Sequence, residues 1–267
     1  MDPLDRLESA SVYVIREAYH RFERMALLWS MGKDSTTLLW LCRKAFLGRV
    51  PFPVVHLDTG RKFPEMYAFR DRYAREWGLD LIVARNEAAL AEGVSPDTVP
   101  ASQCCHRLKT EALTQAIQQH GFQAVLLGIR RDEHGVRAKE RYFSPRDARS
   151  QWHYRHQPAE LWGHYASADA EGGHLRIHPL LHAREVDVWR YVRREGIPAV
   201  GLYFARDGAR YRSIGCRTCC LPVASEARTV DAVIDEVAAS TVAERHGRVQ
   251  DKEHAYTMQK LRALGYM

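Results

Sequence analysis

Short apolar runs alternate with longer segments of helical periodicity through the first half of the chain. The strand-like runs are MALLWS (25–30), PFPVVHLD (51–58), LDLIVAR (79–85) and FQAVLLG (122–128). Segments with the length and apolar spacing of helices separate them, as in EMYAFRDRYAREW (65–77). This order is typical of βαβ units with parallel strands. We therefore expect an α/β fold, a doubly wound and mostly parallel sheet flanked by helices.

The remainder of the chain has weaker periodicity. Residues 129–174 are rich in Arg, His, Trp and Gly, which predicts a long irregular functional loop. A helix is expected over 184–196 with Gly196 as its stop, and residues 226–267 are predicted to be mostly helical. We divide the chain into an α/β domain over 1–200 and a C-terminal extension over 201–267 that carries a cysteine motif and helices.

Charge and apolar content restrict the class of protein. The hydrophobic share of 46% is enough for a sizeable core, and no apolar run is long enough to cross a membrane. The first residues lack the apolar block of a secretory signal, so we expect a cytoplasmic protein. The 39 Lys+Arg against 33 Asp+Glu, a net charge of +6, favour a polyanionic partner without choosing between nucleotide and nucleic acid.

The segment SMGKDS (30–35) lies between a strand-like run and a helix-like run. Gly32 permits close approach of the backbone to an anion, the helix start supplies N–H groups, and Lys33 adds a full charge. The segment lacks the upstream glycine of the GxxxxGK[ST] loop. It could also merely cap a helix, but its position after a strand favours phosphate binding.

Five ordered motifs carry a resemblance to a known family. SMGKDS, HLDTG (56–60), GIRRDE (128–133), VRAKER (136–141) and ASTVAERHGRVQD (239–251) resemble the adenine nucleotide alpha-hydrolase-like (PP-loop) superfamily. Within it, the chain is similar to the branch of phosphoadenylylsulfate reductase and the sulfate adenylyltransferase small subunit. The resemblance implies an ATP pyrophosphatase domain over residues 1–200 that cleaves ATP between the α and β phosphates and transfers AMP to an acceptor.

The resemblance also implies roles for single residues. The β and γ phosphates would be held by Ser30, Gly32, Lys33, Asp34 and Ser35.

By the same resemblance, a second group of residues would lie near the ribose, the α phosphate and Mg²⁺. Asp34 or Asp58 would hold the ion, and His56 with Asp58 would lie near the ribose. Arg130 and Arg131, directly after Gly128, would grip phosphate or a bound oxyanion.

Structural alternatives exist for these assignments. Asp58 could cap a turn with Thr59, and the charges of 137–141 could belong to a solvated loop. The cations and aromatic residues of 129–157, with Trp152 and Tyr154 among them, could grip nucleic acid or close over ATP.

Five cysteines lie in two groups, Cys104 with Cys105 and Cys216 with Cys219 and Cys220. Two pairs from distant segments can supply four ligands to one metal centre. Zinc is one alternative and buried thiols are another. The arrangement resembles the [4Fe–4S] ligand set of adenylylsulfate reductases, which implies Cys104, Cys105, Cys216 and Cys219 as ligands and Cys220 as an alternative.

Two departures from the family shape the functional hypothesis. No cysteine follows Cys220, so the mobile C-terminal nucleophile of a reductase is missing, and the small subunit of sulfate adenylyltransferase does not carry the four-cysteine set. We therefore expect an iron–sulfur-dependent enzyme that inserts sulfur into nucleic acid, resembling the ATP pyrophosphatase of DNA phosphorothioation, supplied by a cysteine desulfurase and forming a homo-oligomer.

Two other functions stay open. The first is the catalytic small subunit of sulfate adenylyltransferase, which would pair with a GTPase subunit. The second is a nucleotide sensor with a structural metal and no turnover, against which the intact Lys33, Asp34 and Asp58 argue.

Overall fold

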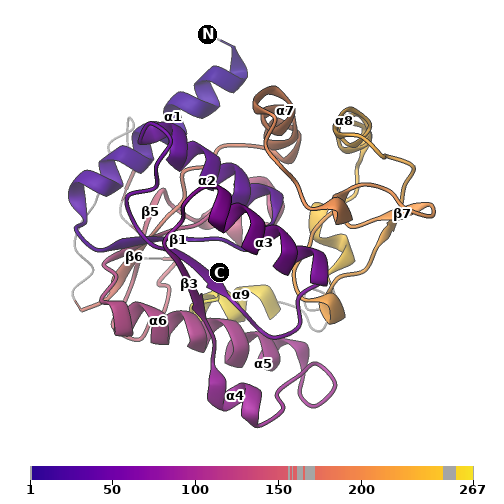
Figure 1. Cartoon of the computed structure of the whole chain (residues 1–267). Coiled ribbons are helices and arrows are strands. Elements are labelled where there is room, and N and C mark those ends of the chain that lie inside the picture. Colours follow the sequence, from indigo (N-terminus) through magenta and orange to yellow (C-terminus); the bar gives the residue numbers. More distant parts are fainter. Residues whose placement is uncertain are drawn as a thin grey trace.

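A six-stranded sheet lies at the centre of the computed structural model (Figure 1), which describes residues 2–155, 157, 159–160, 165, 172–248 and 257–266. The strand order is β3-β2-β1-β4-β6-β5. All neighbours pair in parallel except β5 and β6. The strands are β1 (Met25–Leu28), β2 (Val54–Leu57), β3 (Leu81–Ala84), β4 (Ala124–Leu126), β5 (Phe143–Arg146) and β6 (His174–Ile177). The α/β fold with a mostly parallel sheet is therefore confirmed.

Helices cover both faces of the sheet (Figure 1). One face packs against α1 (Pro3–Arg21), α2 (Lys33–Ala45), α3 (Pro64–Glu76) and α7 (Glu185–Glu195). The other face packs against α6 (Ala112–His120), beside which lie α4 (Glu87–Ala91) and α5 (Ala101–Cys105). None of the described helices is both long and apolar enough to span a bilayer.

Alternate residues of β1 explain why its sequence is a continuous apolar run. Met25 and Leu27 belong to the core cluster under α1 and α2, whereas Ala26 and Leu28 belong to the cluster under α6. A strand covered by helices on both faces needs apolar side chains at every position.

Helix α7 ends at the predicted stop, Gly196, and α6 ends in the same way. Gly121 after α6 and Gly196 after α7 both adopt φ 63°, the left-handed conformation that glycine reaches without a steric penalty.

The segment predicted as a loop over 129–174 contains a strand and two 3-10 turns, Arg131–Glu133 and Arg137–Lys139. The strand β5 is an edge strand with Pro145 at its third residue. An edge strand has only one neighbouring strand, so it tolerates proline. β5 also has no continuous apolar run, which is why the sequence did not predict it. Residues 156, 158, 161–164 and 166–171 of the expected loop lie outside the described residues.

In its described residues, the C-terminal extension has two α-helices, α8 (Val230–Ala239) and α9 (Thr257–Ala263), and a small sheet that the sequence did not predict. That sheet pairs β7 (Ala209–Arg210) with β8 (Val223–Ala224), and two-residue strands are too short to show a periodic pattern. Residues 249–256 of the extension lie outside the described part of the chain. The boundary at residue 200 stays a prediction.

The C-terminal segment docks onto the sheet through buried arginines. The Arg176 guanidinium donates to the carbonyl oxygens of Gly265 and Tyr266, the latter at 3.0 Å. Glu140 accepts hydrogen bonds from Arg262 of α9 and, at 2.8 Å, from Arg146 of β5. These contacts hold Tyr266 in the wall of the cavity described next.

Candidate nucleotide site and cysteine chamber

The loop of residues 30–35 connects β1 to the start of α2. The two hydroxyls of Ser30 and Ser35 lie 3.0 Å apart, and the Ser30 amide donates to Ser35 Oγ at 3.2 Å. Gly32 is the N-cap of α2, and a Cβ there would lie 3.3 Å from Ser30 Oγ. The loop therefore wraps tightly around the positive end of a 13-residue helix, an arrangement suited to phosphate.

Gly128 lets the chain after β4 touch this helix start. A Cβ at Gly128 would lie 2.8 Å from the backbone C and O of Asp34 and 2.9 Å from the Ser35 nitrogen. The structure thus gives Gly128 a packing role beside the loop.

Six charged side chains, four of them buried, form an ion cluster over the loop. Lys33 pairs with Asp34 at 3.1 Å between Nζ and Oδ2, and also with Glu244. Arg130, which is fully buried, pairs with Asp34 and Glu244 and, at 3.0 Å, with Asp132. Lys33 and Arg130 therefore converge on the loop with carboxylates as their partners, and their roles in phosphate binding stay predictions.

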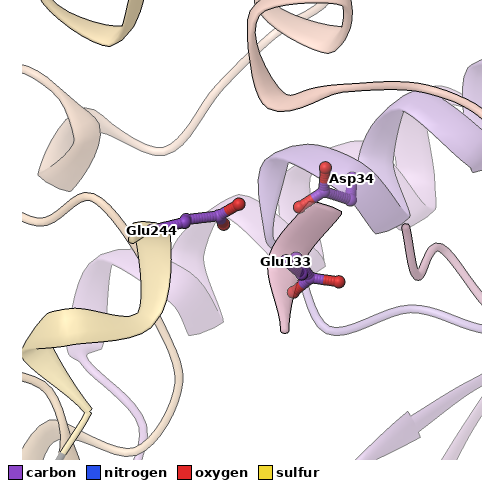
Figure 2. A group of neighbouring side chains, drawn as sticks. All are labelled: Asp34, Glu133 and Glu244. Atoms are coloured by element: carbon purple, nitrogen blue, oxygen red, sulfur yellow. The ribbon is translucent and has the colours of Figure 1, made fainter. Parts of the chain in front are cut away.

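Three carboxylates meet in this cluster. Figure 2 shows Asp34, Glu133 and Glu244, which come from α2, from the turn Arg131–Glu133 and from the 3-10 turn Glu244–Gly247. One oxygen from each lies within 4.8 Å of the others. Burial raises the pKa of Glu244, but Arg130 and Lys33 outweigh that effect and hold the pKa below its usual value. The Glu244 carboxylate is therefore charged, as a metal ligand must be.

Arg131 lies apart from this cluster. Its guanidinium stacks over the Tyr142 ring at 5.4 Å and lies 3.9 Å from a Glu160 oxygen. The structure therefore does not bring Arg131 together with Arg130, because consecutive residues at this turn point in different directions.

His56 and Asp58 are engaged elsewhere as well. His56 is fully buried with Nδ1 3.1 Å from the Trp29 carbonyl oxygen, and burial with the charge of Lys62 lowers its pKa to about 3. Asp58 accepts hydrogen bonds from Tyr67 at 2.7 Å and from Arg85 at 2.9 Å. Neither side chain lines the cavity into which the loop opens, called the nucleotide cavity below. Their roles near ribose and Mg²⁺ therefore stay predictions.

The loop opens into a cavity at the carboxyl ends of β1, β2 and β4, where parallel sheets bind ligands. One wall is apolar and suits a purine ring; it is formed by Leu28, Val55, Leu57, Leu127 and Ile129. The other walls carry Tyr203, Tyr266 and the cations Lys62, Lys109 and Arg248.

The four predicted ligand cysteines line one small chamber next to this cavity. Cys104 and Cys105 come from α5, and Cys216 and Cys219 flank the 3-10 turn after residue 215. Among the described residues, no three cysteine sulfurs lie within 4.8 Å of one another. A tetrahedral zinc site needs sulfurs about 3.8 Å apart, given Zn–S bonds of about 2.3 Å. The described cysteines are therefore not arranged as a tetrahedral zinc site, and the metal centre they would form stays a prediction.

Electrostatics differ among these thiols. Burial raises the pKa of Cys216, but Lys109 and Lys62 outweigh it and lower the pKa to about 6. Burial, followed by the neighbouring Cys105, raises the pKa of Cys104 to about 12. Cys216 is therefore mainly a thiolate at neutral pH. Cys104 keeps its proton, which a metal would have to displace.

Cys220 and Cys42 lie outside the chamber lining. Cys220 Sγ is 2.8 Å from Nη1 of Arg248, and Cys42 is buried within α2. Cys220 stays the alternative ligand, and Cys42 is a core residue.

Comparison with known proteins gives the family. A family model described as the phosphoadenosine phosphosulfate reductase domain matches residues 24–222. The chain belongs to the phosphoadenosine phosphosulfate reductase domain family. This confirms the resemblance drawn from the motifs.

Two relatives align with this chain over almost its whole length. It is 41% identical to sulfate adenylyltransferase subunit 2 of Nocardia farcinica over 293 residues, which cover 98% of this chain and 95% of the relative. It is 39% identical to the protein of the same name from Saccharophagus degradans, with 98% and 97% covered.

Two solved structures share the fold of the reductase-domain chain. Phosphoadenylyl-sulfate reductase from Candida auris has a TM-score of 0.54 at 18% identity, covering 82% of this chain and 97% of the other. Yeast FAD synthetase in complex with FAD has a TM-score of 0.58 at 17% identity, covering 93% and 92%.

Sequence reasoning missed several residues of the reductase-domain site. Glu133 and Glu244 lie in two of the family motifs, but the resemblance assigned them no role. In the structure both belong to the ion cluster. Tyr203, whose hydroxyl accepts the Lys33 amide at 2.8 Å, gave no local signal because only the folded chain brings it to the loop.

Proposed function

We propose that this chain is an adenylyltransferase that transfers AMP from ATP to sulfate and releases pyrophosphate, as the catalytic subunit of a sulfate adenylyltransferase. The observation that carries the proposal is the loop of residues 30–35, with Lys33 and Arg130 over it, in a chain whose named relatives match almost its whole length. ATP is the expected nucleotide, and the proposed partner is the GTPase subunit that the sequence left open as an alternative.

The proposed reaction is one displacement at phosphorus. A sulfate oxygen attacks the α phosphorus, the bond from that phosphorus to the bridging oxygen breaks, and pyrophosphate leaves with the electron pair. Charge develops on the leaving group, so fixed cations near the β and γ phosphates lower the barrier. In this proposal Lys33 and Arg130, which lie beside the loop, supply these charges.

The carboxylates of the ion cluster fit a magnesium ion. Mg²⁺ prefers carboxylate and phosphate oxygens, and Asp34, Glu133 and Glu244 offer three of the former within 4.8 Å. Phosphates that take over the pairing of Lys33 and Arg130 would release Asp34 and Glu244 for the ion. Bound there, Mg²⁺ would neutralise phosphate charge.

The proposal is tested by incubating the purified chain, with and without its GTPase partner, with ATP, Mg²⁺ and sulfate. We expect adenylylsulfate and pyrophosphate in equal amounts. The proposal would be overturned if pyrophosphate release did not depend on sulfate but required nucleic acid.

The cysteine chamber favours a second candidate function. Transfer of AMP to sulfate needs no thiol, whereas four cysteines line one chamber here. Cys104, Cys105, Cys216 and Cys219 would hold a [4Fe–4S] cluster, which supplies iron sites for sulfur chemistry. The second candidate is therefore the sulfur-insertion enzyme of DNA phosphorothioation type, with nucleic acid and a cysteine desulfurase as partners. The cytoplasmic location and the homo-oligomer stay predictions.

Anaerobic purification with iron and sulfide counting separates the two candidates. A cluster enzyme gives brown protein with absorbance near about 400 nm, and Cys216→Ala loses the iron while ATP still binds. The matched control is Cys42→Ala, a buried cysteine outside the chamber. Colourless protein without iron would remove the second candidate.

A further inference from the structure

A basic groove opens at the carboxyl end of β2, beside both the nucleotide cavity and the cysteine chamber. Its polar lining consists of Thr59, Gly60, Arg61, Lys62, Arg217 and Thr218. None of these residues belongs to the ion cluster, and three of them are shared with the lining of the cysteine chamber.

Backbone pairing between two distant segments builds the groove. The Arg217 amide donates to the Arg61 carbonyl oxygen at 2.8 Å, and Lys62 forms an antiparallel bridge with Cys216. Gly60 turns the chain with φ +68°, and its amide donates to Asp58 Oδ1 at 2.8 Å. Arg61, Lys62 and Arg217 are therefore set beside one another by backbone hydrogen bonds.

The cations of the groove have no carboxylate partner. Among the described residues, no Asp or Glu oxygen lies within salt-bridge distance of Arg61, Lys62 or Arg217. Asp58, the nearby acid, already pairs with Arg85. Lys62 is only 9% exposed, and a buried cation is costly without a counter-charge.

The charge of Lys62 is partly opposed within the fold. Burial lowers the pKa of Lys62, the Cys216 thiol acts in the opposite direction, and Lys109 and Arg248 lower it further. Arg61 and Arg217, which have no carboxylate partner among the described residues, therefore supply the positive charge that an anion would neutralise.

Its lining connects the groove to both neighbouring sites. Lys62 also lines the nucleotide cavity. Thr59, Arg61 and Thr218 also line the cysteine chamber. An anion held in the groove would therefore lie next to the cavity in which ATP is proposed to bind.

We propose that Arg61, Lys62 and Arg217 form a binding site for a tetrahedral oxyanion, separate from the phosphate loop, that holds the acceptor of the adenylyl group. The role as acceptor site rests on the proposed function, whereas oxyanion binding does not. The two arginines offer the planar forks that match sulfate or a phosphodiester. The hydroxyls of Thr59 and Thr218 contact the sulfurs of Cys216 and Cys219 instead.

The test uses the whole chain saturated with an α,β-methylene analogue of ATP, which occupies the phosphate loop and resists cleavage. Equilibrium dialysis then measures the dissociation constant of radiolabelled sulfate. In the double variant Arg61→Ala, Arg217→Ala we expect that constant to rise at least about tenfold, because charge-assisted contacts are lost. The dissociation constant of the ATP analogue should change less than about twofold, because neither arginine lines the nucleotide cavity.

The control is the double variant Arg6→Ala, Arg190→Ala, which removes two exposed arginines of α1 and α7. It should bind sulfate like the parent chain. A rise in the sulfate constant equal to that of the groove variant would overturn the site, since general charge would then explain both.

A second arm identifies the source of the oxyanion. A short single-stranded oligonucleotide that loses affinity in the groove variant, while sulfate does not bind, supports the site with a phosphodiester as its ligand. If neither ligand responds to the groove variant, the site is wrong.

Activity separates this proposal from the proposed function. No adenylylsulfate from a chain whose groove still binds oxyanion would refute the proposed function alone. Normal adenylylsulfate formation with an unchanged KM for sulfate in the groove variant would refute the groove alone.

Discussion

Lys33 is held between Asp34 and Glu244 before any phosphate arrives. Its side chain is 1% exposed, so its charge is screened little by solvent. The same residue is thus both a member of a buried ion network and the proposed clamp for the leaving group.

Lys33→Ala should lower ATP-dependent pyrophosphate release by about 100-fold or more, the usual cost of removing one fixed donor to developing charge. A coupled pyrophosphate assay measures this. Lys44→Ala is the control, because Lys44 pairs with Glu8 and Glu195 away from the cavity. Turnover within a factor of about two of the parent in the Lys33 variant would contradict the assignment of the loop.

Glu244→Gln should tighten the binding of metal-free pyrophosphate by about tenfold, because a carboxylate no longer competes for Lys33 and Arg130. Turnover with Mg²⁺ should fall, since a proposed ligand of the ion is lost. Calorimetric titration with and without Mg²⁺ measures both effects. Glu226→Gln, an exposed site, serves as the control. Weaker pyrophosphate binding without metal would show that Glu244 does not occupy the phosphate site.

At the scale of elements, the contact between the end of β4 and the start of α2 positions the loop. Gly128 has backbone atoms of Asp34 within 2.8 Å of where its Cβ would be, and backbone cannot turn aside as a flexible side chain can. A side chain here must push the two elements apart.

Gly128→Ala should therefore destabilise the fold by about 1–3 kcal/mol and weaken ATP binding. Urea unfolding and nucleotide titration measure the two effects. Gly135→Ala is the matched control, because nothing lies within 4 Å of a Cβ at Gly135. Equal stability of the two variants would mean that the elements separate without cost.

Elements were predictable from sequence where local physics decides them. Strands β1, β2 and β4 are buried and read as mostly apolar runs, whereas β5, with Ser144, Pro145 and Arg146 after one phenylalanine, has no such signal. The pairing of β5 with β6 depends on chain segments far apart in sequence.

The candidate site divides in the same way. The loop with Lys33 was predictable because its residues are consecutive between a strand and a helix. Glu244 and Tyr203 were not, since they reach the loop only after the extension has folded back. The cysteine pairs were found through spacing and resemblance, and their meeting in one chamber is a property of the tertiary fold.

On the scale of the whole molecule, buried histidines make stability depend on pH. Burial, then Arg176, lowers the pKa of His174 to about 2, and burial, against Glu140, lowers that of His178 to about 3. Unfolded histidine titrates near 6.5. Between about pH 6.5 and these folded values the unfolded chain binds more protons, so stability falls as pH falls.

Each such histidine should contribute about 1.4 kcal/mol per pH unit to this loss below about pH 6. Urea unfolding at pH 7.5, 6.0 and 5.0 measures the slope, and His174→Gln should flatten it by that amount. His20→Gln, at an exposed position of α1, should leave the slope unchanged. A parent slope near zero over this range would contradict burial of neutral histidines.

The hydroxyl of Tyr203 accepts the backbone amide of Lys33 at 2.8 Å, from a 3-10 turn that begins the C-terminal extension. Oxygen of an incoming nucleotide can use that amide only if the tyrosine yields it. Occupancy of the loop and placement of the turn are then thermodynamically linked, and the linkage is reciprocal. Any protein that docks on the extension and shifts this turn would thereby change the affinity for ATP, without touching the nucleotide itself.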